Sequence, residues 1–231
     1  MEIKMLELIE GAKRAEGLTV IIDVFRAFSL ECYLYDAGVL RIYPIGALET
    51  AYAMKREMPD ALLFGERGGA RAEGCDFGNS PAQAAGADLA GKVILHTTSA
   101  GTQGIVNAVG ATERVTASLV NADAVVRYIR LKRPEKVSIV AMGKAGVTSA
   151  GEDLLCAEYI RACLLGDPFD LQKAADALRE TAGAHFFDPA RQAIYPAEDF
   201  FLCTRCNRFP FVLQVLENEK HRLYTAPLMV K

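Results

Sequence analysis

The residues best suited to chemistry in this sequence are concentrated between Glu66 and Ser80, in the stretch ERGGARAEGCDFGNS. Its carboxylates, from Glu66, Glu73 and Asp76, are hard oxygen ligands that suit a divalent cation such as magnesium. Arg67 carries a planar guanidinium that suits phosphate or sulfonate oxygens. The glycines of the stretch, such as Gly68 and Gly69, let the backbone approach a ligand closely. The stretch therefore predicts a loop that binds a cation and an anion together.

Two further polar segments follow apolar runs. Asp23 and Arg26 come directly after TVII, and HTTSAGT, at 96–102, comes after VIL. The second segment offers hydroxyls and backbone amides at a strand-to-helix turn, which can form a nest for an anionic oxygen. A metal, arginines and amide donors together are what phosphoryl transfer requires, because positioning and charge stabilisation do most of the work there.

The elements that must position these residues alternate along the chain. Short apolar runs rich in β-branched residues are typical of strands covered on both faces, and helical stretches lie between them. This alternation predicts a three-layer α/β/α fold with a largely parallel sheet, whose ligands gather beyond the carboxyl ends of the strands. The predicted strands are 18–23, 39–45, 61–65, 92–97, 114–119 and 136–142; the predicted helices are 47–58, 81–91 after Ser80 as N-cap, one beginning at Asn121, and one within 149–166.

The domain organisation follows from length and composition. A chain of 231 residues can bury a full core, and it contains no Pro/Ser linker, low-complexity tract or exact short repeat. We therefore predict a single compact unit over 1–231, and leave open whether it consists of two intertwined halves. Residues 185–231, with several prolines, are expected to form an irregular α+β annex at the C-terminus.

Charge and hydropathy limit the partners. A net charge of -3 provides no cationic field for nucleic acid, and no apolar run approaches the roughly 20 residues that a membrane span needs. The first ten residues carry acids where a signal peptide would be basic and then apolar, so we expect a cytoplasmic protein. The pair Cys203 and Cys206 is a lone CxxC without a second pair, and we interpret it as two reduced thiols.

Several residues allow a structural as well as a functional interpretation. Asp23 and Arg26 could simply pair at the start of a helix. Glu152 stands in capping-box spacing after Ser149, which favours a cap and leaves the neighbouring Asp153 freer. His96 is either a satisfied core histidine or a catalyst. The motifs GxSxG, GxxxxGK[ST] and GxGxxG are absent, which argues against serine esterases, P-loop enzymes and dinucleotide-binding domains.

Four segments, VIIDVFRAFS, GERGGARAEGCDFGNSP, HTTSAGTQGI and AGEDLLCAEYI, resemble the 2-phosphosulfolactate phosphatase family and keep its order. The resemblance runs from about residue 18 to 165 and continues more weakly towards the end. It implies a magnesium-dependent phosphatase on a family-specific α/β/α fold, which hydrolyses 2-phosphosulfolactate to sulfolactate and phosphate, a step of coenzyme M biosynthesis. It also implies a homo-oligomer, for which a homodimer is the simplest assembly.

The resemblance and the residue types together give a hypothesis for the site. Magnesium would bridge the phosphate and a water molecule, the arginines would neutralise phosphoryl charge, and the remaining donors would bind the anionic groups of a small substrate. The alternatives are a phosphatase or lyase for another small phospho-hydroxy acid, or a non-catalytic anion-binding protein. The predicted catalytic residues are Asp23, Arg26, Glu66, Arg67 and Asp76; the metal ligands are Asp23, Glu66 and Asp76; the substrate-binding residues are Ser29, Gly68, Gly69, Asn79, Ser80, Thr97, Thr98, Ser99, Gly101 and Thr102.

Overall fold

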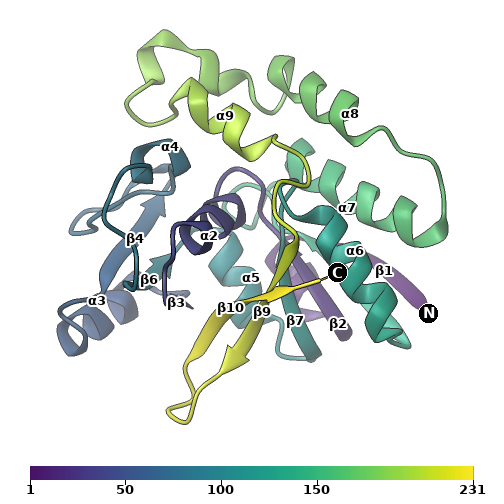
Figure 1. The fold of residues 1–231 in the computed structure, drawn as a ribbon, viewed down its shortest axis with the longest axis horizontal. Coiled ribbons are helices and arrows are strands. Elements are labelled where there is room, and N and C mark those ends of the chain that lie inside the picture. Colours follow the sequence, from purple (N-terminus) through teal and green to yellow (C-terminus); the bar gives the residue numbers. More distant parts are fainter. Residues whose placement is uncertain (231) are drawn as a thin grey trace.

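A single ten-stranded sheet forms the centre of the molecule (Figure 1) in the computed structural model, which describes residues 1–230. Two groups of parallel strands are joined by an antiparallel hairpin, and a short strand pairs antiparallel at one edge. The first group, in spatial order, is β1 (Glu2–Glu7), β8 (Lys136–Ala141), β2 (Gly17–Ile22) and β7 (Ala111–Ala117); the hairpin is β9 (Phe211–Glu217) and β10 (Leu223–Met229); the second group is β3 (Arg41–Pro44), β6 (Val93–Thr97) and β4 (Leu62–Arg67), edged by β5 (Ala70–Arg71).

Helices cover both faces of the sheet. On the first strand group, α6 (Ala122–Lys132) and α7 (Gly151–Leu165) pack against one face, and α1 (Leu8–Lys13) and α5 (Gly101–Asn107) against the other. On the second group, α2 (Ala27–Asp36) and α3 (Leu48–Glu57) cover opposite faces. Most residues of β2, β3, β4, β6 and β8 are buried, as their largely apolar sequences predict for strands covered on both faces. The predicted three-layer α/β/α fold with a largely parallel sheet is confirmed.

The observed ends of the helices can be compared with the predicted capping residues and helix ends. α6 begins directly after Asn121, and α7 ends at Gly166, which adopts a left-handed conformation with φ of 86°. Ser80 caps α4 (Pro81–Ala84) by accepting from the Gln83 backbone N–H, but this helix stops after four residues instead of reaching 91. The capping box at Ser149 does not form, because α7 starts after Ala150 and the Ser149 hydroxyl donates to Glu7.

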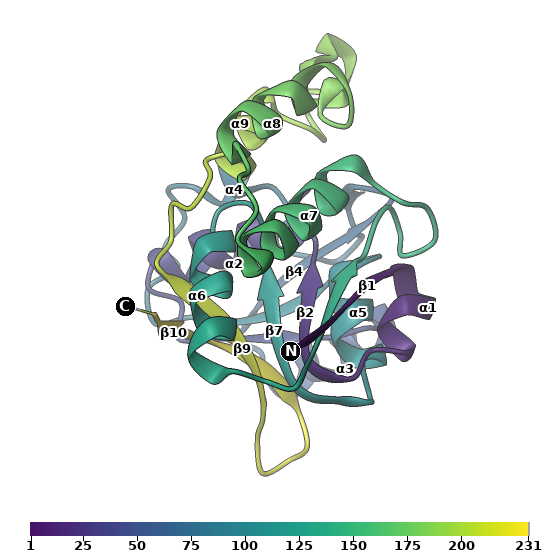
Figure 2. The ribbon, with the colours of Figure 1, turned by 90° about the vertical axis from the view of Figure 1, so that its right-hand side faces the viewer.

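The predicted C-terminal annex, 185–231, is divided between two places. Its last strands enter the middle of the sheet as the β9–β10 hairpin, because alternating apolar residues there pair with β7 and β3. The part before them joins α8 to form a helical arm, residues 171–203, which rises above one end of the sheet (Figure 2). The arm consists of α8 (Leu171–Ala177), the 3-10 helices η1 (Leu178–Glu180), η2 (Ala184–Phe187) and η3 (Pro189–Arg191), and α9 (Ala197–Cys203).

The described helices and cysteines add two facts. Within residues 1–230 no helix combines the length and the apolar character needed to cross a bilayer. All six cysteines are free thiols, and four of them, Cys203 included, are buried. Cys206 is partly exposed and donates to the backbone carbonyl of Thr204.

Candidate active site

A cleft of about 410 Å³ lies between the helical arm and the loops that follow β2, β4, β6 and β8. It holds acidic side chains on the sheet side and basic side chains from the arm and the loop after β8. The polar and charged side chains that line it are Asp23, Arg26, Glu66, Asn79, Ser99, Lys144, Thr148, Ser149, Glu152, Asp153, His185, Arg191 and Tyr195. Such a concave site with convergent polar groups is the strongest candidate for substrate binding.

Hydrogen bonds show that the three predicted polar segments meet here. Asp23 Oδ2 accepts from the backbone N–H of Gly101 over 2.8 Å. Glu66 accepts from Ser99 N–H over 2.6 Å and from Gly69 N–H over 2.7 Å. Three successive antiparallel pairings, β7–β9, β9–β10 and β10–β3, separate the two groups of parallel strands, so the groups run in opposite directions. The ends of β2, β4 and β6 can therefore meet only because the sheet curls.

Among the carboxyl groups of the cleft, those of Asp23 and Glu152 have raised pKa values. Burial, followed by the charge of Glu66, raises the pKa of Asp23 to about 6, although hydrogen bonds from Ala27 and Gly101 act the other way. Burial, with a contribution from Asp23, raises the pKa of Glu152 to about 7. Paired carboxylates with raised pKa values are typical of sites that transfer protons or bind a cation.

Glu152 and Asp153 have the opposite roles to those that the capping pattern favours. Asp153 is buried, and its carboxylate accepts from the backbone N–H groups of Val24 and Gly143 over 2.7 and 2.8 Å. It therefore holds the loops after β2 and β8 together. Glu152 lines the cleft, and the one hydrogen bond that lowers its pKa comes from its own backbone N–H. Its carboxyl group is thus available to a ligand.

The basic side chains of the cleft come from three elements. Arg26 is buried and donates to Asp199 over 2.7 Å, to the Ile194 carbonyl over 2.8 Å and to the Gly69 carbonyl over 2.7 Å. Lys144 and Arg191 are exposed at the rim, and the Arg191 guanidinium lies 4.5 Å from the centre of the Tyr195 ring. Arg26 consequently ties the arm to the body, while the rim cations are free to meet an anion.

Two of the predicted catalytic residues, Arg67 and Asp76, lie outside the cleft. Successive side chains of a strand point to opposite faces, so Glu66 faces the cleft and Arg67 faces away, where it donates to Thr97 Oγ1 over 3.0 Å. Asp76 Oδ2 accepts from the Leu63 backbone N–H over 2.7 Å and lies 3.4 Å from Lys55 Nζ. The structure thus separates both residues from Asp23 and Glu66.

The predicted substrate-binding residues also divide into those that lie at the cleft and those that lie away from it. Gly68, Gly69, Asn79 and Ser99 line the cleft, and Gly101 contributes its backbone N–H to Asp23. Gly69 has a φ of +86°, and a Cβ atom there would lie 1.7 Å from the Tyr195 hydroxyl oxygen, so a larger residue would strain the backbone and displace the Tyr195 side chain. The remaining residues are engaged in internal hydrogen bonds: Ser29 with Val24 and Ser118, Ser80 with Asp199, Thr97 with Arg67, and Thr98 with Thr102.

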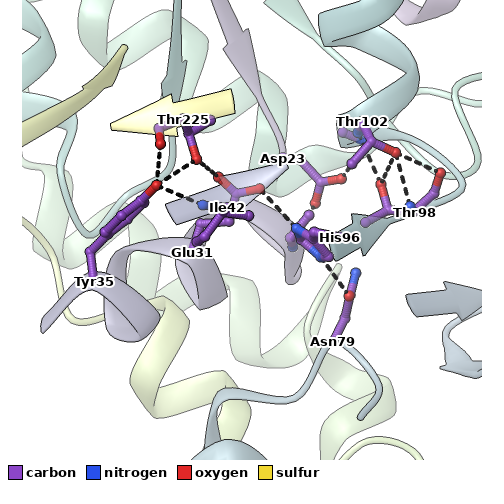
Figure 3. A network of polar contacts seen from close by, with 11 residues as sticks. Asp23, Glu31, Tyr35, Ile42, Asn79, His96, Thr98, Thr102 and Thr225 are labelled. Atoms are coloured by element: carbon purple, nitrogen blue, oxygen red, sulfur yellow. Dashed lines mark hydrogen bonds and ion pairs between the residues drawn. The ribbon is translucent and has the colours of Figure 1, made fainter. Parts of the chain in front are cut away.

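A buried polar network lies directly behind the cleft (Figure 3). His96 Nδ1 is 2.8 Å from Glu31 Oε1, and His96 Nε2 is 2.9 Å from Asn79 Oδ1. The Thr225 hydroxyl donates to Glu31 Oε2 over 3.2 Å and is itself 3.2 Å from the Tyr35 hydroxyl. His96 is therefore satisfied by hydrogen bonds, yet one of its partners lines the cleft.

The carboxylates of the cleft can be compared with the ligands that magnesium takes in proteins. Residues 1–230 contain no group of three or more His, Cys, Asp or Glu side chains arranged as a metal cage. Magnesium, however, usually keeps several waters and takes only one or two carboxylates together with substrate phosphates. Asp23, Glu66 and Glu152 share the cleft, and burial raises the pKa values of Asp23 and Glu152. The site thus fits a magnesium ion held by few protein ligands.

Several cleft residues carry no signal in the sequence. Lys144 and Thr148 belong to an irregular loop after β8, His185 and Arg191 belong to the 3-10 helices of the arm, and Tyr195 follows η3 in a turn. Neither place has a periodic pattern or a motif. The one usable signal is positional, since Lys144 follows the end of a parallel strand.

The sequence is similar to those of known proteins. A profile of the 2-phosphosulpholactate phosphatase family matches residues 3–215. The chain is 28% identical over 207 residues to a probable 2-phosphosulfolactate phosphatase of Bacillus subtilis, covering 87% of this chain and 88% of that protein. It is 37% identical over 161 residues to one from Carboxydothermus hydrogenoformans, covering 69% and 66%. It is 38% identical over 164 residues to one from Gloeobacter violaceus, covering 70% and 69%.

The family match spans every loop that lines the cleft, from Asp23 to Tyr195. The resemblance seen in the four sequence segments is therefore confirmed across nearly the whole chain. The chain belongs to the 2-phosphosulfolactate phosphatase family, a family of phosphoric monoester hydrolases.

Proposed function

We propose that this protein is a magnesium-dependent phosphatase that hydrolyses 2-phosphosulfolactate to sulfolactate and inorganic phosphate. The observation that carries the proposal is the cleft itself, in which Asp23, Glu66 and Glu152 face Lys144 and Arg191 within about 410 Å³. The substrate carries phosphate, sulfonate and carboxylate groups, so it needs cations on more than one side. The names of the relatives support the same substrate.

The acidic side of the cleft is assigned to the phosphate. Asp23 and Glu66 would hold a magnesium ion, which supplies Lewis-acid stabilisation of the phosphoryl group when bound. The backbone loops around Ser99 and Gly69 are fixed by hydrogen bonds to Glu66, so their geometry is preorganised before substrate enters. The rim cations Lys144 and Arg191 would bind the sulfonate and carboxylate oxygens.

Glu152 is the best placed proton acceptor. Its pKa of about 7 leaves a useful fraction ionised at neutral pH while its conjugate acid remains a competent donor. In the proposed step a water oxygen bonds to phosphorus while its proton passes to Glu152. The ester P–O bond breaks, and the leaving oxygen of sulfolactate takes up the proton that Glu152 has accepted.

The wider setting of the reaction is part of the same proposal. The reaction would serve coenzyme M biosynthesis, in the cytoplasm, and the protein would act as a homodimer. Sedimentation of the purified protein at micromolar concentration tests the assembly.

The activity is tested by measuring phosphate release from racemic 2-phosphosulfolactate, phospholactate and phosphoglycolate, each with magnesium and with EDTA. We expect magnesium-dependent release that prefers the sulfonated substrate. Release from the other substrates alone would keep the chemistry and replace the substrate. No release from any of them would leave a binding protein as the better description.

A further inference from the structure

Tyr195 follows η3 in a turn, and its ring contacts both arginines that line the cleft. The guanidinium carbon of Arg191 lies 4.5 Å from the centre of the ring, and that of Arg26 lies 4.9 Å from it. The negatively polarised face of an aromatic ring attracts a guanidinium at such distances. The proposed reaction uses Arg191 but gives Tyr195 no part.

The two arginines differ in what else holds them. Arg26 is buried, forms an ion pair with Asp199 and donates to two backbone carbonyl groups. Arg191 is exposed, and within residues 1–230 its guanidinium forms neither an ion pair nor a hydrogen bond. Arg26 would therefore keep its place without the Tyr195 ring, whereas the direction of the Arg191 side chain depends on the ring.

Tyr195 is itself fixed in position. Its hydroxyl donates to the Gly68 carbonyl over 3.1 Å, in the space that a Cβ atom on Gly69 would need. Its backbone N–H donates to the Arg191 carbonyl over 2.8 Å, so the two side chains leave the same turn. The His185 ring packs edge-on against the tyrosine, with ring centres 4.6 Å apart. The ring is thus held against the turn that joins β4 to β5.

A ring is a suitable support for an arginine that must bind an anion. An exposed arginine has many rotamers, and binding costs the free energy of fixing one of them. The contact with Tyr195 restricts Arg191 before the anion arrives. Unlike a carboxylate partner, the neutral ring does not cancel the charge of the guanidinium, and its face accepts no conventional hydrogen bond. The N–H donors of Arg191 therefore remain available to oxygen atoms of a ligand.

We propose that Tyr195 is a positioning residue whose ring holds the Arg191 guanidinium at the rim of the cleft, ready to bind an anionic group of the ligand. The identity of that group as the sulfonate or carboxylate of 2-phosphosulfolactate rests on the proposed function. The contact between the two side chains does not, because the chain itself makes it.

The first test compares Tyr195→Leu, which removes the ring, with Tyr195→Phe, which keeps it. Tyr195→Leu should raise KM for 2-phosphosulfolactate by about 3-fold to 10-fold with little change in kcat, because a contact that orients Arg191 for binding is lost. Tyr195→Phe should keep a KM close to that of the wild type. A lower kcat with an unchanged KM in Tyr195→Leu would overturn the proposal.

The second test asks whether Tyr195 acts through Arg191. Arg191→Ala should raise KM by about 10-fold, and adding Tyr195→Leu to it should raise KM no further, because the ring then has no guanidinium to hold. Additive effects would contradict the inference. Arg179→Ala is the matched control, since Arg179 lies in the same arm with its guanidinium 4.5 Å from the Phe187 ring but outside the cleft lining. This variant should behave as wild type.

A third test does not need turnover. The ring current of Tyr195 should move the side-chain proton resonances of Arg191 upfield in arginine-labelled full-length protein, with the assignment made from Arg191→Ala. The upfield shift should persist in Tyr195→Phe and disappear in Tyr195→Leu. Its absence from the wild type would overturn the proposal, even if Tyr195→Leu does not fold.

These measurements separate failure of the inference from failure of the proposed function. If the wild type releases no phosphate from any substrate, the proposed function fails, while the ring-current shift still decides whether Tyr195 holds Arg191. Calorimetric binding of sulfolactate to the wild type and to Arg191→Ala then takes the place of turnover. Weaker binding by the variant would support the anion-binding role, and equal or absent binding in both would refute it.

Discussion

Arg26 and Asp199 form a buried ion pair in which Nη1 and Oδ2 are 2.7 Å apart and the side chains are 3% and 0% exposed. The other oxygen of Asp199 accepts from the Ser80 hydroxyl and from the Ala82 backbone N–H, each over 2.9 Å. The pair thereby connects the loop after β2, the start of α4 and the helical arm. Arg26, predicted as a catalytic residue, and Ser80, predicted as a substrate-binding residue, both help through this pair to hold the arm over the cleft.

Replacing Asp199 with Ala should destabilise the protein by about 3–5 kcal/mol, because the Arg26 charge is left buried without its partner. Urea denaturation measures this loss. Glu158→Ala is the control, since it removes an exposed ion pair with Arg161 and should cost less than about 1 kcal/mol. Equal losses in the two variants would show that the arm does not depend on the buried pair.

Anion binding should depend on the rim cations and not on Arg67. Changing Lys144 and Arg191 together to Ala should raise KM for 2-phosphosulfolactate by about 10-fold to 100-fold, because charged hydrogen bonds to the substrate are lost. Arg67→Ala, on the opposite face of β4, should change kcat/KM by less than about 5-fold. Steady-state kinetics of the variants decide the question. A larger loss in Arg67→Ala would return that residue to the active site.

Glu152→Gln should lower kcat by about 100-fold, within the range of a lost general acid or base. The rise of kcat in the wild type near pH 7 should disappear, because the titrating carboxyl is gone. A pH series of initial rates measures both effects. Glu158→Gln on the same helix, exposed and far from the cleft lining, should keep the wild-type profile. An unchanged pH profile in Glu152→Gln would assign the proton transfer elsewhere.

The raised pKa values of Asp23 and Glu152 predict how stability depends on pH without metal. Their folded-state pKa values, about 6 and about 7, exceed the ordinary values of 3.8 and 4.5. Their contribution to stability is therefore complete below about pH 4 and is lost as pH rises through 6 and 7. Magnesium should restore stability above pH 7 by binding the ionised Asp23 carboxylate.

Thermal unfolding from pH 5 to pH 8, with magnesium and with EDTA, tests this dependence. The difference between wild type and a combined Asp23→Asn and Glu152→Gln variant isolates the two groups from all other titrations. We expect the variant to gain relative stability as pH rises and to show no magnesium effect. A magnesium effect that survives in the variant would place the ion at a different site.

The sequence by itself determined the α/β/α architecture, six of the parallel strands and the positions of the helices α3, α6 and α7. The physical reason is local, because doubly covered strands are continuously apolar and capping residues act within one turn. It also indicated that Asp23, Glu66 and the 96–102 segment serve one site, because each follows a predicted strand. What brings them together is the curl of a sheet whose two strand groups run in opposite directions. The family was recognisable from the four polar segments alone.

Only the tertiary structure decided which residues face the cleft. The side chains of Glu66 and Arg67 diverge because β4 continues through both residues, an extent that the predicted strand 61–65 did not include. Glu152 and Asp153 exchange roles because the loops after β2 and β8 supply N–H partners to Asp153. The arm reaches the cleft through the Arg26–Asp199 pair, whose members are 173 residues apart in the chain. Such contacts depend on long-range packing, which no local pattern encodes.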